Sequence, residues 1–230
     1  MARINAVAAE RVRIRDRIVL WFVRRGLAKA TGTDSEKVLK PLRMYARLPG
    51  LFSGYTKLEQ ATAKLHGIDH RLHALAELKA ATLTSCEYCI DLGSAIAHQW
   101  GLSDAELLAL PDYASSPLFS DLDKLVLDYA VAISRTPVDV SDELFDRVRQ
   151  HFTDAQIVEL THYIALENMR GRFNLALGIG SSGVSEGMVC AIPVTRPLQD
   201  GDVPLQDGDV PRTTAPVGRP RRESNSRQKD

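Results

Sequence analysis

Apolar side chains recur every three to four residues along most of the chain, which is the period of an amphipathic helix. No segment shows the regular alternation of β-branched and polar residues that is typical of strands. The segments with a helical period are residues 11–29, 35–46, 51–65, 70–83, 86–100, 103–111, 121–134, 141–151 and 153–178. We therefore expect an all-α protein, folded as a single-domain antiparallel helical bundle.

Several helix starts are marked by side chains that can accept hydrogen bonds from the first backbone N–H groups. Asp69 precedes the helix of residues 70–83, and Ser85 stands before the helix that follows. Two later starts have the pattern of a capping box, in which two side chains and two backbone groups bond reciprocally. These are Ser103 with Glu106 and Thr153 with Gln156.

The N-terminal segment is rich in arginine and lysine, although Lys+Arg and Asp+Glu both total 29 in the whole chain. Because the net charge is balanced, the overall charge recommends neither nucleic acid nor an anionic membrane as a partner. We interpret residues 1–33 as a basic helical arm. It either packs Ile14, Ile18 and Phe22 on a neighbour or lies on a membrane surface.

The composition changes again near Pro193. Residues 193–230 are rich in Pro, Gly, Asp, Ser and Arg, and the sequence LQDGDVP occurs there twice in tandem. Such a segment buries too little apolar surface to offset the entropy of ordering, so we expect a disordered tail. The helical domain therefore comprises residues 34–192.

No apolar run reaches the ~20 residues that span a bilayer. The segment IVLWFV near the N-terminus is also too short for the core of a secretory signal. We expect no stable membrane insertion and a cytoplasmic location, where thiols stay reduced and disulfides tend to be transient.

The sequence TSCEYCIDLG, residues 84–93, places Cys86 and Cys89 one turn apart at the start of a helix. Their sulfur atoms can approach bonding distance, and the positive end of the helix dipole lowers the pKa of a thiol there. By this argument Cys86 is the better thiolate and Cys89 the more protected partner. A zinc site needs about four ligands, which this chain does not supply at ligand spacing, so we expect no metal or cofactor. Two buried structural thiols remain the alternative to a redox pair.

The sequence around the cysteines, ELKAATLTSCEYCIDLGSAIAHQWGLSDAELLAL, resembles the carboxymuconolactone decarboxylase/alkylhydroperoxidase D-like superfamily, and so does ALENMRGRFNLALGIGSSG further along. The resemblance implies an AhpD-like helical fold, a homo-oligomer and a thiol peroxidase. In that chemistry a thiolate attacks a hydroperoxide, the second cysteine closes the disulfide, and a dithiol reductant reopens it. Carried over by position, Cys89 attacks and Cys86 resolves. The helix dipole favours the opposite order, so the assignment stays open.

Two residues of the family's proton relay are absent from this chain. The peroxidases have a His four residues after the second cysteine and a Glu twelve residues before the first, where this chain has Gly93 and Ala74. Without a base, either thiol attacks peroxide slowly. Glu77 lies about one helical turn from the missing glutamate, so we predict that it accepts the proton.

Four further residues are candidates for the relay. His73 shares a helix face with Glu77, and His162 is a candidate for the space that Gly93 leaves. Asp91 and His98 are out of phase with the cysteines, so we expect a solvated or capping carboxylate and a partly exposed histidine that faces away.

The sequence thus predicts an antioxidant thiol-disulfide oxidoreductase that reduces hydroperoxides, with Cys86, Cys89 and Glu77 as its catalytic residues. One alternative is a non-catalytic helical scaffold or small-molecule binder that has lost the proton relay. Another is a lyase or decarboxylase of the same family, whose acid–base chemistry does not need the cysteine pair.

Overall fold

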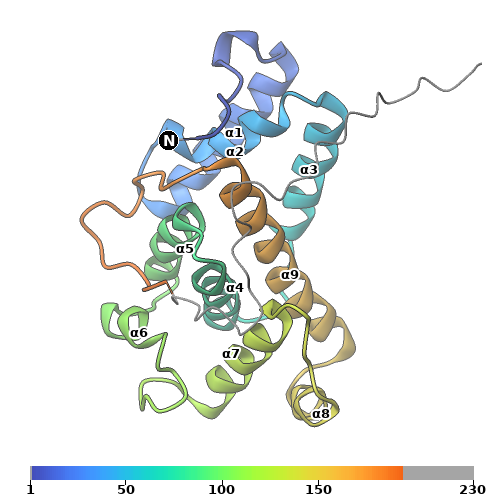
Figure 1. The fold of residues 1–230 in the computed structure, drawn as a ribbon, viewed down its shortest axis with the longest axis vertical. Helices are drawn as coiled ribbons and strands as arrows, with labels where there is room; N and C mark the ends of the chain where they lie inside the picture. The colour runs from blue at the N-terminus through green and yellow to red at the C-terminus, as the bar shows by residue number, and fades with distance from the viewer. Residues whose placement is uncertain (1, 194–230) are drawn as a thin grey trace, which may run out of the picture. The chain divides into compact units, whose positions relative to one another are not determined.

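A computed structural model describes residues 2–193, and these residues are helical without any strand (Figure 1). The elements are η1 (Ala9–Arg11), α1 (Ile14–Thr31), η2 (Glu36–Leu39), α2 (Lys40–Tyr45), α3 (Pro49–Thr62), α4 (His70–Thr84), α5 (Glu87–Gln99), α6 (Asp104–Ala109), α7 (Asp121–Ser134), α8 (Asp142–His151) and α9 (Asp154–Leu177). The all-α prediction is therefore confirmed. The predicted repeat-containing tail lies outside the described residues, except for Pro193.

The helix boundaries follow the capping signals at most of the predicted positions. The Asp69 side chain accepts a hydrogen bond from the Arg71 N–H, and both capping boxes are formed at the starts of α6 and α9. The prediction for Ser85 is wrong, because this residue ends α4 in the left-handed conformation with φ 55°. Cys86 is the N-cap of α5 instead, so only two residues, Ser85 and Cys86, separate the two helices.

Helix α4 lies at the centre of the described residues and packs against α5, α7 and α9 (Figure 1). Alanines on several of its faces let the neighbouring helices approach closely; they are Ala74, Ala76, Ala80 and Ala81. One buried cluster contains Leu75 and Leu78 together with both cysteines, and a second fills the space between α4, α7 and α9. Because α4 is enclosed in this way, the position of its C-terminal end and of the cysteine turn is fixed by core packing.

Helix α1 packs on α5 and η2 through Leu20 and the partly buried Val19, Val23 and Leu27. The predicted packing of Ile14, Ile18 and Phe22 on a neighbour is not found among residues 2–193, where all three side chains are exposed. In the part of the chain that the structure describes, no helix combines the length and apolar character required to cross a membrane.

After α9 the chain returns along α5 and is fastened to it by three polar side chains on one helix face. The Asp91 carboxylate accepts hydrogen bonds from the backbone N–H groups of Ser182 at 2.7 Å and Ser185 at 3.0 Å, and from both serine hydroxyls. Ser94 accepts from the Ala191 N–H, and His98 Nε2 lies 2.9 Å from the Val189 carbonyl oxygen.

Asp91 is therefore a buried carboxylate that accepts the backbone N–H groups of a loop, so of its two expected roles the solvated side chain is wrong and the capping carboxylate fits. The spacing of Asp91, Ser94 and His98 places them on one side of α5. These polar side chains bind the backbone of a segment remote in sequence, and their spacing along the helix does not reveal such partners.

Candidate active site

Cys86 and Cys89 are joined by a disulfide at the start of α5, with their Cα atoms 5.2 Å apart. The Cys86 side chain turns back under the first turn, where its sulfur accepts the Cys89 N–H at 3.3 Å. Cys86 consequently has no exposed surface, whereas Cys89 is 6% exposed. This order differs from the prediction that Cys89 is the more protected cysteine, because the N-cap position points the Cys86 sulfur into the core.

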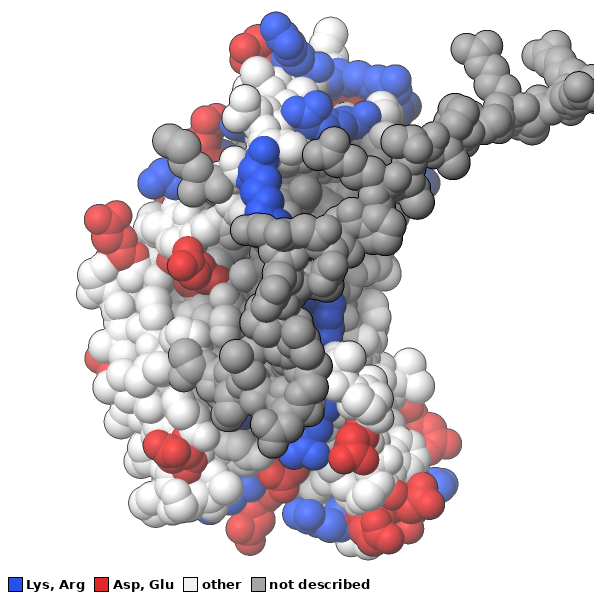
Figure 2. All heavy atoms as spheres, in the orientation of Figure 1, with Lys and Arg blue, Asp and Glu red and all other residues white. Residues whose placement is uncertain are grey.

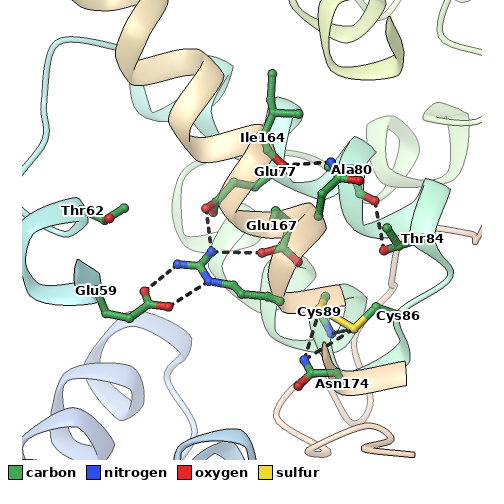
Figure 3. A network of polar contacts seen from close by, with 12 residues as sticks. Glu59, Thr62, Glu77, Ala80, Thr84, Cys86, Cys89, Ile164, Glu167 and Asn174 are labelled. Atoms are coloured by element: carbon green, nitrogen blue, oxygen red, sulfur yellow. Dashed lines mark hydrogen bonds and ion pairs between the residues drawn. A yellow bond between two sulfur atoms is a disulfide. The ribbon is translucent and has the colours of Figure 1, made fainter. Parts of the chain in front are cut away.

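A buried amide on α9 faces both sulfur atoms (Figure 3). The Asn174 Nδ2 group lies 3.7 Å from the Cys86 sulfur and 3.6 Å from the Cys89 sulfur. Its Oδ1 atom is buried and has no hydrogen-bond partner among the described residues. The Nδ2 group therefore donates to sulfur, which stabilises a thiolate, while the Oδ1 atom of the same amide is left as a buried acceptor without a partner.

One helical turn before Asn174, the guanidinium of Arg170 binds three carboxylates from three helices (Figure 3). Glu59 of α3 receives two hydrogen bonds, 3.0 Å from Nε and 2.6 Å from Nη2. Nη1 lies 2.9 Å from Glu77 of α4 and 3.0 Å from Glu167 of α9. One cation thus ties together α3, α4 and α9, and it faces more negative charge than it can neutralise.

The excess negative charge gives the two inner carboxyl groups different proton affinities. Burial favours the neutral form of Glu77, but the nearby His73 and Arg170 outweigh it and hold the pKa of Glu77 well below its usual range. Burial raises the pKa of Glu167 to about 7, and the neighbouring carboxylates Glu77 and Glu59 add to this shift while Arg170 opposes it. Of the two, Glu167 is the carboxyl group able to exchange a proton near neutral pH.

Glu167, Arg170 and Asn174 recur at intervals of three and four residues, so they share the face of α9 that points toward α4 and the cysteines. Close contact between the helices depends on Gly171. A Cβ atom at that position would lie 2.6 Å from the Thr84 Oγ1 atom, just before the cysteine turn. The absence of a side chain there lets α9 place Asn174 against the sulfurs.

The sequence analysis did not identify Asn174, Arg170, Glu167 or Glu59 as site residues. The segment ENMRGRFN does carry a signal. A carboxylate, a guanidinium and an amide share one face of the helix there, and the residues that flank the segment are apolar. Glu59 has no such signal, because only the tertiary arrangement brings α3 to Arg170.

Two of the predicted relay residues lie in this network. His73 Nε2 is 3.2 Å from the Glu77 carboxylate, as their spacing on one helix face suggested. The His73 ring also stacks on Tyr163 of α9, with 3.5 Å between ring centroids. Glu77 itself contacts Arg170 rather than either sulfur.

The remaining candidates serve other contacts. His162 Nε2 lies 2.7 Å from the Thr62 hydroxyl. It precedes Asn174 by twelve residues, or roughly 18 Å along α9, so it does not reach the space beside Gly93. Asp91 and His98 hold the returning segment on α5, as described above. Among residues 2–193 no group of three metal-binding side chains is suitably placed for a metal ion.

The two positions that hold relay residues in the family are taken here by Ala74 and Gly93, and both residues pack against core side chains. Ala74 is buried in the same cluster as both cysteines. A Cβ atom at Gly93 would lie 3.1 Å from Leu78 Cδ1, so a larger side chain there must displace a core leucine. The polar groups around the sulfurs come from α9 instead.

Comparisons with known proteins agree with this architecture. The model of the carboxymuconolactone decarboxylase family matches residues 49–131, which include the cysteine pair. The uncharacterized protein YnjA of Escherichia coli (strain K12) is 36% identical over 167 residues, which cover 70% of this chain and 86% of YnjA.

Two solved structures share the fold at low sequence identity. A peroxidase-related protein from Ralstonia eutropha JMP134, described as an alkylhydroperoxidase AhpD core, aligns with a TM-score of 0.66 and 16% identity, covering 84% of this chain and 98% of its own. The debrominase Bmp8, in complex with 2,3,4-tribromopyrrole, aligns with a TM-score of 0.66 and 18% identity, covering 81% and 95% respectively. The fold and the extent of the match to YnjA show that this chain belongs to the carboxymuconolactone decarboxylase family.

Proposed function

We propose that the protein is a thiol-disulfide oxidoreductase that reduces hydroperoxides with Cys86 and Cys89. The observation that carries this proposal is the buried Asn174 amide, which donates to both sulfurs although its own oxygen atom has no hydrogen-bond partner among the described residues. A pair of structural thiols in an apolar core needs no such donor, and burying an amide with an unsatisfied oxygen lowers stability.

The reaction begins with the reduced pair and consumes two electrons for each hydroperoxide. The Cys89 thiolate attacks the terminal peroxide oxygen, the O–O bond breaks, and the alkoxide leaves as an alcohol after taking a proton. The Cys86 thiolate then attacks the Cys89 sulfenic acid, water leaves, and the disulfide forms. A dithiol reductant returns two electrons and two protons and restores both thiols.

We assign the attack to Cys89 because it is the cysteine with exposed surface, whereas Cys86 is fully enclosed. The N–H of Cys89 and the amide of Asn174 both donate to the Cys86 sulfur, which suits a resolving thiolate held ready inside the turn. The free Oδ1 atom of Asn174 can accept a hydrogen bond from the hydroxyl of the hydroperoxide or of the sulfenic acid.

For the proton acceptor we propose Glu167 in place of the predicted Glu77. Glu77 is held ionised by Arg170 and His73, and a carboxylate with a low pKa is a weak base. The pKa of Glu167 is about 7, and its side chain lies on the same face of α9 as Asn174. In this proposal Glu77 fixes Arg170 and so sets the proton affinity of Glu167.

The proposal is tested by counting thiols and peroxide together. A Cys190→Ser background removes the free third cysteine and leaves only the pair to titrate. We expect one equivalent of cumene hydroperoxide to consume two thiols in this protein. In addition, Cys86→Ser is expected to yield a trappable sulfenic acid on Cys89, and Cys89→Ser to leave the peroxide intact.

A trapped sulfenic acid in Cys89→Ser would reverse the order of attack but keep the chemistry. Thiols that persist for hours with peroxide present would instead support a scaffold or binding protein. A turnover that survives replacement of both cysteines would support a lyase or decarboxylase.

The same dithiol can in principle reduce a carbon–halogen bond, and the likeness to the debrominase Bmp8 over most of both chains makes this the second candidate. Here an aryl bromide and two thiols give the aryl hydrogen, hydrogen bromide and the disulfide. Incubation of the reduced Cys190→Ser protein with 2,3,4-tribromopyrrole, followed by bromide release, distinguishes this acceptor from a hydroperoxide.

A further inference from the structure

The outer face of α1 exposes four large apolar side chains in one stripe. The exposed fractions are 78% for Ile14, 55% for Ile18, 53% for Trp21 and 64% for Phe22. Their spacing of four, three and one residues keeps them on one side of a helix. The Trp21 and Phe22 rings contact each other edge to face with centroids 4.8 Å apart, so the stripe is continuous there.

This stripe points directly away from the rest of the described residues. The residues by which α1 is anchored, Leu20, Val23 and Leu27, lie about 180° around the helix from Ile14, Ile18 and Trp21, at about 100° for each residue. The anchored face fixes α1 on α5, and the outer apolar face has no covering element among residues 2–193.

Cationic side chains border the stripe on both sides. Arg13 and Arg17 lie along one edge and Arg15 along the other, and all three are exposed. Arg25 extends over the Trp21 ring, with its guanidinium carbon 5.4 Å from the ring centroid. Figure 2 shows Lys and Arg side chains gathered at the top of this face, where Figure 1 places the N-terminal segment that contains α1.

Acidic groups neutralise only part of this border. Asp16 is paired with Arg15, and Asp34 and Glu36 are paired with Arg24 on the same edge as Arg13 and Arg17, whereas Arg13, Arg17 and Arg25 form no salt bridge within residues 2–193. Glu10 is an exposed carboxylate just before α1. The outward surface therefore combines exposed Ile, Trp and Phe side chains with an excess of positive charge.

We propose that α1 docks on the surface of an anionic lipid bilayer, lying in the interface with Ile14, Ile18, Trp21 and Phe22 immersed and the arginines at the phosphate level. An apolar stripe with basic flanks and an interfacial tryptophan matches the requirements of such a surface. A second copy of the chain fits less well, because a twofold interface uses the same face of both copies and so sets one cationic border against another. The docking is independent of the thiol chemistry proposed above.

The test is flotation of the full chain with vesicles of phosphatidylcholine alone and of phosphatidylcholine containing phosphatidylserine. We expect binding to the anionic vesicles only, weakened by salt, and lost by about tenfold or more in the double variants Ile18→Asn/Phe22→Asn and Arg13→Glu/Arg17→Glu. The matched control is Val158→Asn, which changes a side chain of 69% exposure on α9 and is expected to bind like the wild type.

A second measurement leaves the residues of α1 unchanged. In a Trp100→Phe protein, Trp21 is the only remaining indole, and its emission is expected to shift to shorter wavelength when anionic vesicles are added. Absence of vesicle binding by the wild type overturns the proposal, as does binding that the α1 variants leave unchanged. A fall in molecular mass in Ile18→Asn/Phe22→Asn, without vesicle binding by the wild type, assigns the face to a second copy instead.

Discussion

The carboxylate of Asp91 carries most of the attachment of the C-terminal segment to the cysteine helix, so we expect Asp91→Asn to destabilise the protein substantially. The carboxylate accepts two backbone N–H groups and two hydroxyls from Ser182 and Ser185, all of them buried. An amide of the same shape keeps one oxygen acceptor, loses the charge, and turns an NH₂ group toward those donors.

The magnitude follows from the proton affinity of the group. Burial raises the pKa of Asp91, but the hydrogen bonds from Ser182 and Ser185 outweigh it and lower the value to about 2, from 3.8 for a free side chain. At about 1.36 kcal/mol for each pKa unit, this lowering corresponds to about 2 kcal/mol of folding free energy for the ionised form. Since the variant also leaves buried donors poorly satisfied, we expect a loss of about 2–4 kcal/mol at pH 7.

The pH dependence separates this effect from a simple packing defect. Because the folded pKa is lower than the unfolded one, the contribution of Asp91 is complete above about pH 4 and disappears as the pH falls toward about 2. Urea unfolding followed by circular dichroism, at pH 7 and at several points between pH 4 and 2, measures the difference between wild type and variant. We expect that difference to shrink along this series.

The matched control is Asp146→Asn, at an exposed position of α8 that makes no such contacts. Its free energy of unfolding should change by less than about 0.5 kcal/mol. The segment held by Asp91 also places Ile179 and Ala191 in the cluster around the cysteines, so reduced Asp91→Asn protein should react faster with an alkylating reagent. Equal stability of Asp91→Asn and Asp146→Asn at neutral pH would refute the reasoning.

Three further changes test the packing and charge around the site. Gly171→Ala places a Cβ atom 2.6 Å from Thr84 Oγ1 and should lower the free energy of unfolding, measured by thermal unfolding, by about 1–3 kcal/mol. Adding Thr84→Ala to the same chain should recover part of this loss, and purely additive effects of the two changes would contradict the contact. In stopped-flow oxidation, Glu167→Gln should remove a rise in the rate of disulfide formation through about pH 7, whereas an unchanged profile would exclude Glu167 as the proton acceptor. Lys79 is buried and its pKa is lowered to about 8 by that burial, so the folded state is disfavoured while the lysine is charged. Lys79→Met should therefore stabilise the protein at pH 7 by about 1–3 kcal/mol, even though the contact of Lys79 with the Tyr113 ring is lost. The stabilisation should be smaller at pH 10, and a destabilised variant at pH 7 would contradict this reasoning.

Many of the helix boundaries can be predicted from the sequence because they depend on nearby residues. The start of α7 at Asp121, the capping boxes of α6 and α9, and the end of α9 at Gly178 each depend on residues within one turn of the boundary. Ser85 was misassigned because its neighbours are compatible with two adjacent helix ends. A serine can serve as N-cap, but here it adopts the left-handed conformation that ends the preceding helix.

The candidate site is harder to predict from the sequence because most of its side chains are brought together only by tertiary packing. The cysteine pair and the contact of His73 with Glu77 are local, and their spacing on a helix is sufficient to predict them. The contacts of Arg170 with Glu59 and of Asn174 with the sulfurs join residues about a hundred positions apart, and periodicity carries no information on such pairs. The hydrogen-bond partners of Asp91 could not be predicted for the same reason, since they lie in a segment that follows α9.

The differences from the family's relay then have a consistent physical explanation. Positions 74 and 93 are occupied by residues without polar side chains: Ala74 is buried in the core that holds the cysteines, and the half-buried Gly93 lies against Leu78 of that core. Polar groups are supplied instead from the facing helix, where Asn174 meets the sulfurs and Arg170 gathers three carboxylates one turn away. Burial of Glu167, reinforced by the neighbouring carboxylates Glu77 and Glu59 and opposed by Arg170, raises its pKa to about 7, which is the property that a proton acceptor for a thiol requires. Restoring a histidine at position 93 alone would therefore disturb Leu78 without reconstructing a relay, because the proton affinity of this site is set on α9.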